Sequence, residues 1–396
     1  MKLILVALSC FQIFSMKTVN SSNVTESELL MARVIFRNGK QPPPGATELK
    51  DFLHERLEFN VEPFKGNGLT DEGKVDMYNF GAKIRRWYQS RSQNKADIKN
   101  KLDVQSTSYK SCQESAKFVK SGVLGKNFRK NYDEAVQKSS LDDVLKFLYE
   151  DDGCKSKHYM NGVPYDPTKL RFVFETRNDL VKKMNITLYP KGPYVHNSPD
   201  PHPIKAQHIW KIYEYFEAQR YSKENLPEWL TENMIFDMEE SNRLLMKVLF
   251  EWNYLKKASG GAVYANTILE DFQNKISNSQ SQLPDIKLLC AQEIVVTTAI
   301  SSLLNSKSKI CDKPFEASVV KHGTALITEL HKKNSDHFVK VLYWKLDQDE
   351  PKQIKYAECN NGECTFNEFQ SLFKRSTISE AQLKASTLCK KSDRKI

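Results

Sequence analysis

Two short apolar segments, one near each end of the chain, constrain the fold most strongly. Residues 30–36 read LMARVIF and residues 286–291 read IKLLCA, and both runs end in polar residues. Short apolar runs bounded by turn residues are typical of buried strands. Charged, helical sequence with proline-rich breaks occupies residues 117–260 between them. The pattern therefore predicts an α/β domain built from both ends of the chain, with a helical insertion.

The residues that follow these two strands are the first candidates for a site. Arg37 and Asn38 follow the first strand, and Gln292 and Glu293 follow the second. Ligands of open α/β sheets bind outside the carboxyl ends of the strands, so we expect the two pairs to meet. A helix is predicted to begin after Thr70, and residues 323–330 and 338–346 are predicted to form a closing pair of strands.

The composition excludes several classes of protein. With 40% hydrophobic and 11% aromatic residues, the chain is neither disordered nor collagen-like. Its 27% charged residues exclude a protein with many membrane spans. The net charge of +10 comes from 59 Lys and Arg scattered among 49 Asp and Glu. Such a mixture does not form the basic stripe of a nucleic-acid-binding protein.

The N-terminus predicts secretion. One lysine followed by about a dozen mostly apolar residues is typical of a signal peptide, and the run is too short to span a bilayer. We assign the signal peptide to residues 1–20, with cleavage between Ser15 and Ser22. Asn20, Asn23 and Asn185 lie in glycosylation sequons, which have meaning only in the secretory route. We expect a secreted protein that does not bind membranes.

Seven cysteines remain beyond the signal peptide, so at least one is free or pairs with another molecule. Cys359 and Cys364 flank the turn sequence Asn-Asn-Gly, which predicts a local disulfide. No second closely spaced pair or histidine partner accompanies them, so the sequence predicts no metal site and no cofactor. The pairing of the remaining cysteines stays open at this stage.

Five segments in the right order resemble the histidine acid phosphatases, over nearly the whole mature chain. They are residues 37–43 (RNGKQPP), 66–73 (GNGLTDEG), 105–111 (QSTSYKS), 290–293 (CAQE) and 328–330 (TEL) with the Cys359–Cys364 loop. The resemblance implies an α/β fold with a mixed central sheet flanked by helices, formed by residues 26–117 and 263–396. It implies a helical cap domain at residues 118–262, and a disulfide between Cys154 and Cys389.

The departures from the family pattern concern its catalytic residues. Asn38 stands where the family has a histidine nucleophile, and an amide is not a useful nucleophile. Glu293 takes the place of the aspartic general acid, and only Arg37 of three phosphate-binding arginines remains. The other replacements each remove a positively charged or phosphate-binding side chain: Gln41, Ser111 and Gln292. We therefore predict that the chain is not an enzyme.

A nearly neutral site with Glu293 on one side and Arg37 on the other suits a small charged ligand. A carboxylate attracts ammonium groups, and aromatic rings add cation–π attraction. By resemblance, Tyr149, Trp210 and Tyr213 line the family's cavity. The chain is similar to salivary proteins of blood-feeding fleas that bind biogenic amines and cysteinyl leukotrienes. This likeness implies a monomer that sequesters such small molecules.

Other interpretations remain open. Glu293 could cap its helix or pair with Arg37 across an empty cavity, and the aromatic residues could be core. Lys40 and Lys110 flank the lost arginines and could return a cation to the site. A residual acid phosphatase is one alternative function, and a protein that binds polyanions or platelet surfaces through its charge is another.

Overall fold

The computed structural model describes the sheet and most of the helices around it. The described residues are 27–41, 68–91, 98–128, 136–149, 180, 182, 209–221, 226, 229–251, 260–278, 285–305, 307–315 and 320–385. Several predicted features lie outside them: the signal peptide, the sequons at Asn20, Asn23 and Asn185, and the cysteines Cys154 and Cys389.

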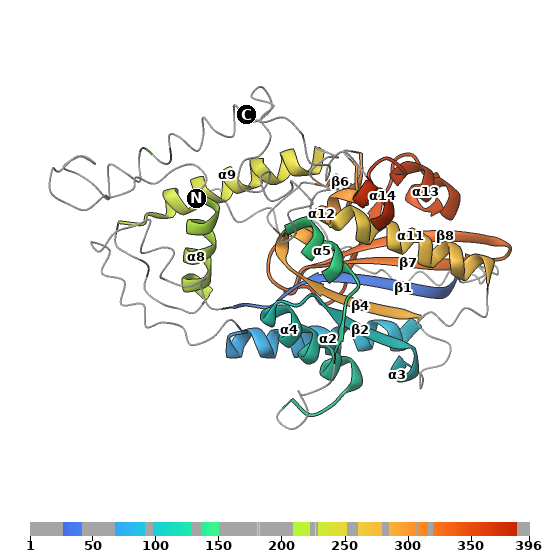
Figure 1. Ribbon diagram of the computed structural model, residues 1–396, viewed down its shortest axis with the longest axis horizontal. Coiled ribbons are helices and arrows are strands. Elements are labelled where there is room, and N and C mark those ends of the chain that lie inside the picture. The colour runs from blue at the N-terminus through green and yellow to red at the C-terminus, as the bar shows by residue number, and fades with distance from the viewer. Residues whose placement is uncertain are drawn as a thin grey trace, which may run out of the picture.

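The fold is α/β, with a mixed ten-stranded sheet among the described residues (Figure 1). The strand order is β3-β2-β4-β1-β7-β8-β9-β5-β6, and β10 pairs with β8. Strands β3, β2, β4 and β1 are parallel, whereas β1 pairs with β7 in the antiparallel sense. The strands are β1 (Glu28–Arg37), β2 (Leu102–Ser106), β3 (Gln137–Lys138), β4 (Ile286–Ala291), β5 (Lys309–Ile310), β6 (Lys313–Pro314), β7 (Ala325–Lys333), β8 (Asp336–Trp344), β9 (Lys352–Lys355) and β10 (Cys364–Thr365).

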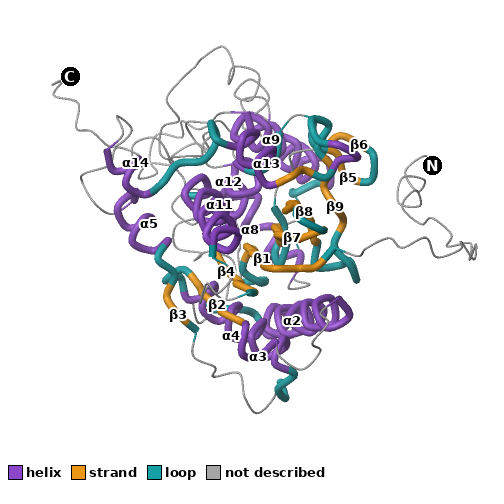
Figure 2. The backbone as a smooth tube through the Cα atoms, turned by 90° about the vertical axis from the view of Figure 1, so that its right-hand side faces the viewer, coloured by secondary structure: helices purple, strands orange, loops and turns teal. Residues whose placement is uncertain are grey.

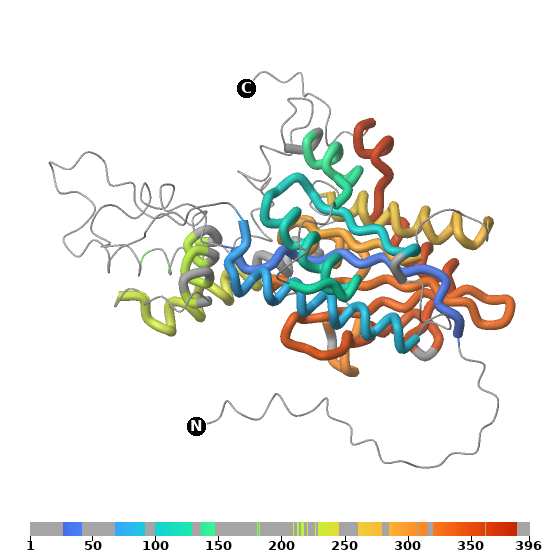
Figure 3. Tube along the Cα trace, turned by 90° about the horizontal axis from the view of Figure 1, so that it is seen from below, coloured from blue at the N-terminus to red at the C-terminus, as the bar shows by residue number. Residues whose placement is uncertain are grey.

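Helices cover both faces of the sheet (Figure 2). One face carries α2 (Asp71–Arg91), α3 (Ile98–Lys101) and α4 (Lys110–Leu124), and α2 and α4 pack side by side (Figure 3). The other carries α5 (Leu141–Tyr149), α11 (Gly261–Ser277), α12 (Glu293–Ser302), α13 (Phe366–Phe373) and α14 (Glu380–Ala385). Helices α8 (Ile209–Tyr221) and α9 (Glu232–Glu251) enclose a third apolar core.

The alternation of side chains along β1 explains the two layers. Met31 and Ile35 enter the core beneath α11 and α12, whereas Val34 and Phe36 enter the core beneath α2 and α4. Successive side chains of a strand point to opposite faces, so Arg37 shares the face of Met31 and Ile35. The strand therefore aims Arg37 toward the α12 side of the sheet.

The fold class predicted from the sequence is confirmed, and β4 occupies the predicted residues 286–291. The boundary proposed at residues 117 and 118 falls inside α4, and Leu141 and Leu145 of α5 pack into the α/β core. The division into α/β and cap domains itself stays a prediction. No described helix is long and apolar enough to cross a membrane.

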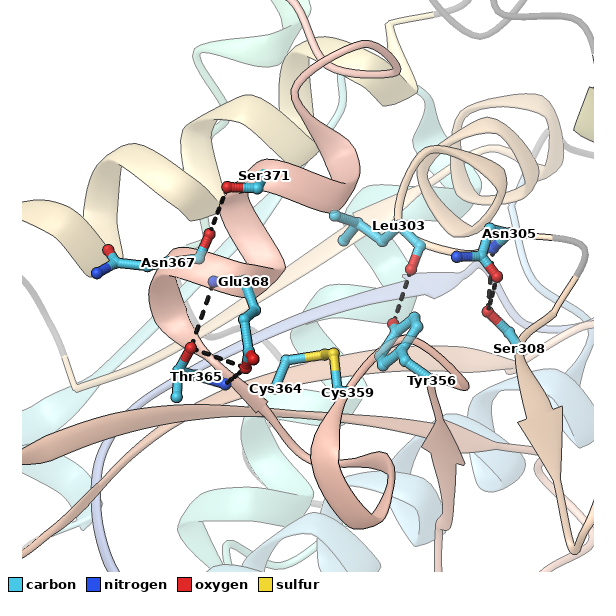
Figure 4. The surroundings of a disulfide bond; sticks show 10 residues. All are labelled: Leu303, Asn305, Ser308, Tyr356, Cys359, Cys364, Thr365, Asn367, Glu368 and Ser371. Atoms are coloured by element: carbon cyan, nitrogen blue, oxygen red, sulfur yellow. Dashed lines mark hydrogen bonds between the residues drawn. A yellow bond between two sulfur atoms is a disulfide. The ribbon is translucent and has the colours of Figure 1, made fainter.

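A disulfide joins Cys359 and Cys364, the pair expected from the sequence (Figure 4). It closes the short helix η2 (Asn360–Gly362) next to α13. Thr365 and Glu368 form a capping box that begins α13, since each side chain accepts a hydrogen bond from the other residue's backbone amide. The disulfide and the cap together anchor the connection between β9 and α13.

Candidate functional site

Parallel pairing of β1 and β4 brings the two predicted segments together. Arg37 lies opposite Ala291 in the register, and the backbone N–H of Asn38 donates a hydrogen bond to the Ala291 carbonyl oxygen at 3.3 Å. Glu293 is the first residue of α12, which begins directly after β4. The carboxyl ends of both strands therefore open onto one site, formed by residues from distant parts of the sequence.

Arg37 and Glu293 form a buried ion pair in this site. Arg37 Nη2 lies 2.8 Å from Glu293 Oε2, and the two side chains are 9% and 8% exposed. Arg37 Nη1 also donates to the carbonyl oxygen of Val320. In the structure, Glu293 therefore pairs with Arg37, as one of the interpretations of the sequence had it. The carboxylate of Glu293 balances the charge of the Arg37 guanidinium.

Asn38 is buried, and its side-chain amide is used in local hydrogen bonds. Nδ2 donates to the Gly39 carbonyl at 3.0 Å and approaches Gln41 Oε1 at 3.4 Å. The Gly39 amide donates to Ser115 Oγ at 3.0 Å, which ties the loop to α4. These bonds hold Asn38 and Gln41 next to each other at the end of β1.

The loop after β1 packs tightly on the start of α2. A Cβ added to Gly73 would lie 2.3 Å from the Lys40 carbonyl oxygen, so only glycine permits this approach. Thr70 begins the helix, since its Oγ1 accepts from the Gly73 amide at 3.0 Å and its own amide donates to the Lys40 carbonyl. The predicted helix start at Thr70 is confirmed.

The charged group of Lys40 lies next to carboxylates of α2. Its Nζ lies 2.6 Å from Glu72 and 3.3 Å from Asp76. Burial lowers the pKa of Lys40, but these two carboxylates outweigh it and raise the pKa above the ordinary value. Lys110 is exposed at the start of α4. The cation of Lys40 is thus balanced by its own carboxylate partners.

Gln292 and Ser111 border the site on the β2 side. Gln292 precedes α12, and its Oε1 accepts a hydrogen bond from Thr107 Oγ1 at 3.2 Å. Ser111 is buried near the start of α4, and its carbonyl accepts from Ser115 Oγ at 2.6 Å. The Ser108 amide donates to Asp142 at 2.8 Å, and burial raises the pKa of that carboxyl. Gln292 and Ser111 thus add no charge at this border, where Asp142 contributes a carboxyl group.

His322 is a site residue that the sequence analysis did not select. Its Nδ1 lies 3.1 Å from the Asn38 carbonyl oxygen, and the ring is half-buried. Burial, with a smaller effect of Arg37, holds the pKa of His322 well below its ordinary range, although the Asn38 carbonyl acts to raise it. His322 is therefore neutral near pH 7. One sequence signal for a turn at this position is Gly323, the residue after His322. In the structure Gly323 has φ +68° and turns the chain into β7.

Of the three aromatic residues expected around the site, the structure describes the side chain of one. Tyr213 is buried in the apolar core of α8 and α9 with Ile212 and Phe216. The side chains of Tyr149 and Trp210 lie outside the described part of the structure. An aromatic wall next to Glu293 therefore stays a prediction. Among the described residues, no group of three His, Cys, Asp or Glu side chains could hold a metal ion.

Comparison with known protein families identifies the family of this chain. The model of the histidine phosphatase superfamily (branch 2) matches residues 46–344. The chain belongs to this family. Because the matched range begins beyond Gln41, membership does not depend on the altered segment after β1.

Relatives in the same family include insect proteins. An acid phosphatase-like protein of Xenopsylla cheopis, XcAP-3, is 25% identical over 82% of this chain and 85% of the relative. The venom acid phosphatase Acph-1 of Apis mellifera is 22% identical over 84% of this chain and 82% of that protein. Apo phytase of Hafnia alvei superposes with a TM-score of 0.61 at 15% identity, over 90% of this chain and 98% of the phytase. The last likeness shows the fold alone.

Proposed function

We propose that this histidine phosphatase-family chain is a secreted protein that binds small charged host mediators and does not hydrolyse phosphomonoesters. The observation that carries the proposal is Asn38. At the end of β1, an amide engaged with Gly39 and Gln41 replaces an imidazole that could attack phosphorus. The N-terminal signal sequence supports secretion.

The charge of the site supports the same proposal. A phosphatase must stabilise a dianion and the negative charge that develops in the transition state. Here the one retained arginine is balanced by Glu293, His322 is neutral, and Lys40 is balanced by carboxylates of α2. A binding site for a phosphate dianion would need positive charge that these residues do not supply.

Biogenic amines such as serotonin, and cysteinyl leukotrienes, are the proposed ligands. The support is the acid phosphatase-like relative from Xenopsylla cheopis and the resemblance to flea salivary proteins with these ligands. Glu293 offers a carboxylate to an ammonium group, and Arg37 offers a guanidinium to a carboxylate. Sequestration of these mediators would oppose vasoconstriction, platelet activation and inflammation, and it requires abundance and slow release instead of turnover.

Calorimetric titration of the purified secreted chain with serotonin, a cysteinyl leukotriene and inorganic phosphate tests the proposal. We expect saturable, roughly one-to-one binding of at least one mediator and none of phosphate. A parallel assay with p-nitrophenyl phosphate at acidic pH should show only the background rate. Absence of heat with both mediators, or hydrolysis that scales with protein and falls in Arg37→Ala, would reject the proposal.

A further inference from the structure

Cys112 and Cys290 lie in the same apolar core, where α4 packs on the sheet. Cys112 is in the first turn of α4, and Cys290 is the last residue but one of β4. Both residues are fully buried, at 0% exposure. The sequence alone leaves the pairing of these two cysteines open, and the proposed ligand binding uses neither thiol.

The periodicities of the two elements direct both side chains into this core. Cys112 and Ala116 are four residues apart on α4, so they lie on the same face of the helix, and both are buried in the core. Cys290 enters the same core from β4, whereas its neighbours Leu289 and Ala291 enter the core on the other side of the sheet. The two cysteines therefore approach one another from opposite sides of a single core.

Hydrogen bonds fix the two segments in this arrangement. The backbone N–H of Thr107, in the loop that leads to α4, donates to the Cys290 carbonyl oxygen at 3.1 Å. Ser115 of α4 is fully buried, and its Oγ donates to the Ser111 carbonyl oxygen at 2.6 Å and accepts from the Gly39 N–H at 3.0 Å. The first turn of α4 is thus held beside the end of β4 through both backbone and side-chain contacts.

The thiols of the two cysteines are in direct contact. Burial, with a smaller effect of the hydrogen bond to the Cys112 thiol, raises the pKa of Cys290 well above its ordinary value, although a hydrogen bond with Ser115 acts to lower it. Because the thiolate is the reactive form in disulfide exchange, the closed core keeps these thiols adjacent but slow to react. Any bond between them forms most readily before the core closes.

We propose that Cys112 and Cys290 are a modification site, at which a disulfide forms between α4 and β4 while the chain folds. Disulfides form in the oxidising compartments of the secretory route, and the structure already contains one between Cys359 and Cys364. The inference relies on the proposed secretion for this oxidising environment, and it does not depend on the proposed ligands.

The reaction is thiol–disulfide exchange, and its oxidant is another disulfide, carried by a small molecule or a protein. One cysteine loses its proton and attacks a sulfur of the oxidant, whose S–S bond breaks and whose first thiolate leaves and takes up a proton. The second cysteine then loses its proton and attacks the mixed disulfide, which releases the second thiol of the oxidant. The two cysteines are oxidised to a disulfide, and the oxidant disulfide is reduced to two thiols.

This bond would cross-link two segments that border the candidate site. Ser111 directly precedes Cys112, and Gln292 lies two residues beyond Cys290. The bond also closes a long segment of the chain, since it joins α4 to β4. A cross-link over a long loop restricts the unfolded chain and so favours the folded state.

Peptide mapping of the purified secreted chain tests the proposal. The protein is unfolded with N-ethylmaleimide in the absence of reductant, and trypsin then releases Cys112 in residues 111–117 and Cys290 in residues 288–307, each as the only cysteine of its peptide. We expect mass spectrometry to find these two peptides joined, and to find them separate after reduction. Recovery of both peptides carrying N-ethylmaleimide, or of either joined to a different cysteine, would overturn the inference.

Matched variants check the assignment. Cys112→Ser should leave Cys290 available to N-ethylmaleimide in the unfolded protein, and Cys290→Ser should do the same for Cys112. Cys311→Ser replaces an exposed cysteine between β5 and β6, and the joined peptides should persist in it. Loss of the joined peptides in Cys311→Ser, or an unmodified Cys290 in Cys112→Ser, would overturn the inference. The mapping of the wild-type chain does not depend on the folding of any variant.

Calorimetric titration of the same wild-type preparation with serotonin and a cysteinyl leukotriene separates this inference from the proposed function. If a mediator binds to a chain that lacks the bond, the inference is wrong and the proposed function stands. If the peptides are joined and neither mediator binds, the inference stands and the proposed ligands are wrong.

Discussion

Arg37 and Glu293 lie far apart in the sequence and form a 2.8 Å ion pair at the carboxyl ends of adjacent parallel strands. The pair lies where the ends of the two strands meet, and the carboxylate of Glu293 balances the charge of Arg37. Its energetic role, its effect on catalysis and its ligand preference can each be measured.

The first prediction concerns the stability contributed by the pair. Glu293→Gln should lower the free energy of unfolding by about 3 kcal/mol, because Arg37 keeps a buried charge without its carboxylate. Arg37→Gln should have a similar effect, whereas the double variant should lose clearly less than the sum of both. Urea denaturation of the three variants measures this coupling, and additive losses would show that the pair is not coupled.

Asn38→His tests whether the nucleophile alone limits catalysis. We expect hydrolysis of p-nitrophenyl phosphate to stay near background, and Asn38→His/Gln292→His to behave in the same way. Both variants still lack cations at Gln41 and Ser111, and one missing electrostatic group costs about 100-fold or more. If Asn38→His alone produced a rate about 100-fold above background, the account of the charge-balanced site would be wrong.

His322 predicts a pH dependence of stability. The pKa of His322 is well below its ordinary range in the folded protein, so the unfolded chain binds more protons between the two values. Stability should therefore fall as the pH decreases below about 6.5. In His322→Asn this contribution should disappear. Thermal unfolding of the wild-type chain and His322→Asn, from neutral to mildly acidic pH, provides the measurement. The same pH dependence of stability in the two proteins would contradict the prediction.

Much of the fold follows from local sequence, whereas parts of the site depend on distant contacts. Strand β4 has five apolar residues between clear breaks, and its bounds could be predicted. Strand β2 (LDVQS) could not, because it is half polar and is recognisable only through its pairing with β4. Likewise, the position of the Lys40 side chain depends on two carboxylates of α2, which lies more than 30 residues later in the sequence. The contact between His322 and Asn38 depends on the pairing of β7 with β1.

Glu329 provides a control far from the site. It is fully buried, and it accepts hydrogen bonds from Trp87 and Arg91 and contacts His331 at 2.8 Å. Burial acts to raise the pKa of Glu329, but the His331 hydrogen bond and the Arg91 charge outweigh it and lower the pKa below the ordinary value.

Glu329→Gln should therefore reduce stability at neutral pH by about 2 kcal/mol or more, since hydrogen bonds to a buried charge are lost. The contribution of Glu329 should itself decrease as the pH falls below the ordinary carboxyl pKa, and it should vanish once the pH is below the lowered pKa of Glu329 in the folded protein. Ligand affinity of the folded variant should remain unchanged. Urea denaturation and calorimetry check both expectations, and weaker ligand binding by the stable variant would disprove the separation between this cluster and the site.

The most direct measurement of the proposed function is the affinity of serotonin for the wild-type chain, Glu293→Gln and Arg37→Ala by calorimetric titration. We predict one-to-one binding by the wild type, and an affinity at least about tenfold lower for Glu293→Gln, which removes the partner of the ammonium group. Arg37→Ala should affect serotonin less than it affects a leukotriene, whose carboxylates require the guanidinium. Unchanged serotonin affinity in Glu293→Gln, or no binding by the wild type, would contradict a ligand site at the Arg37–Glu293 pair.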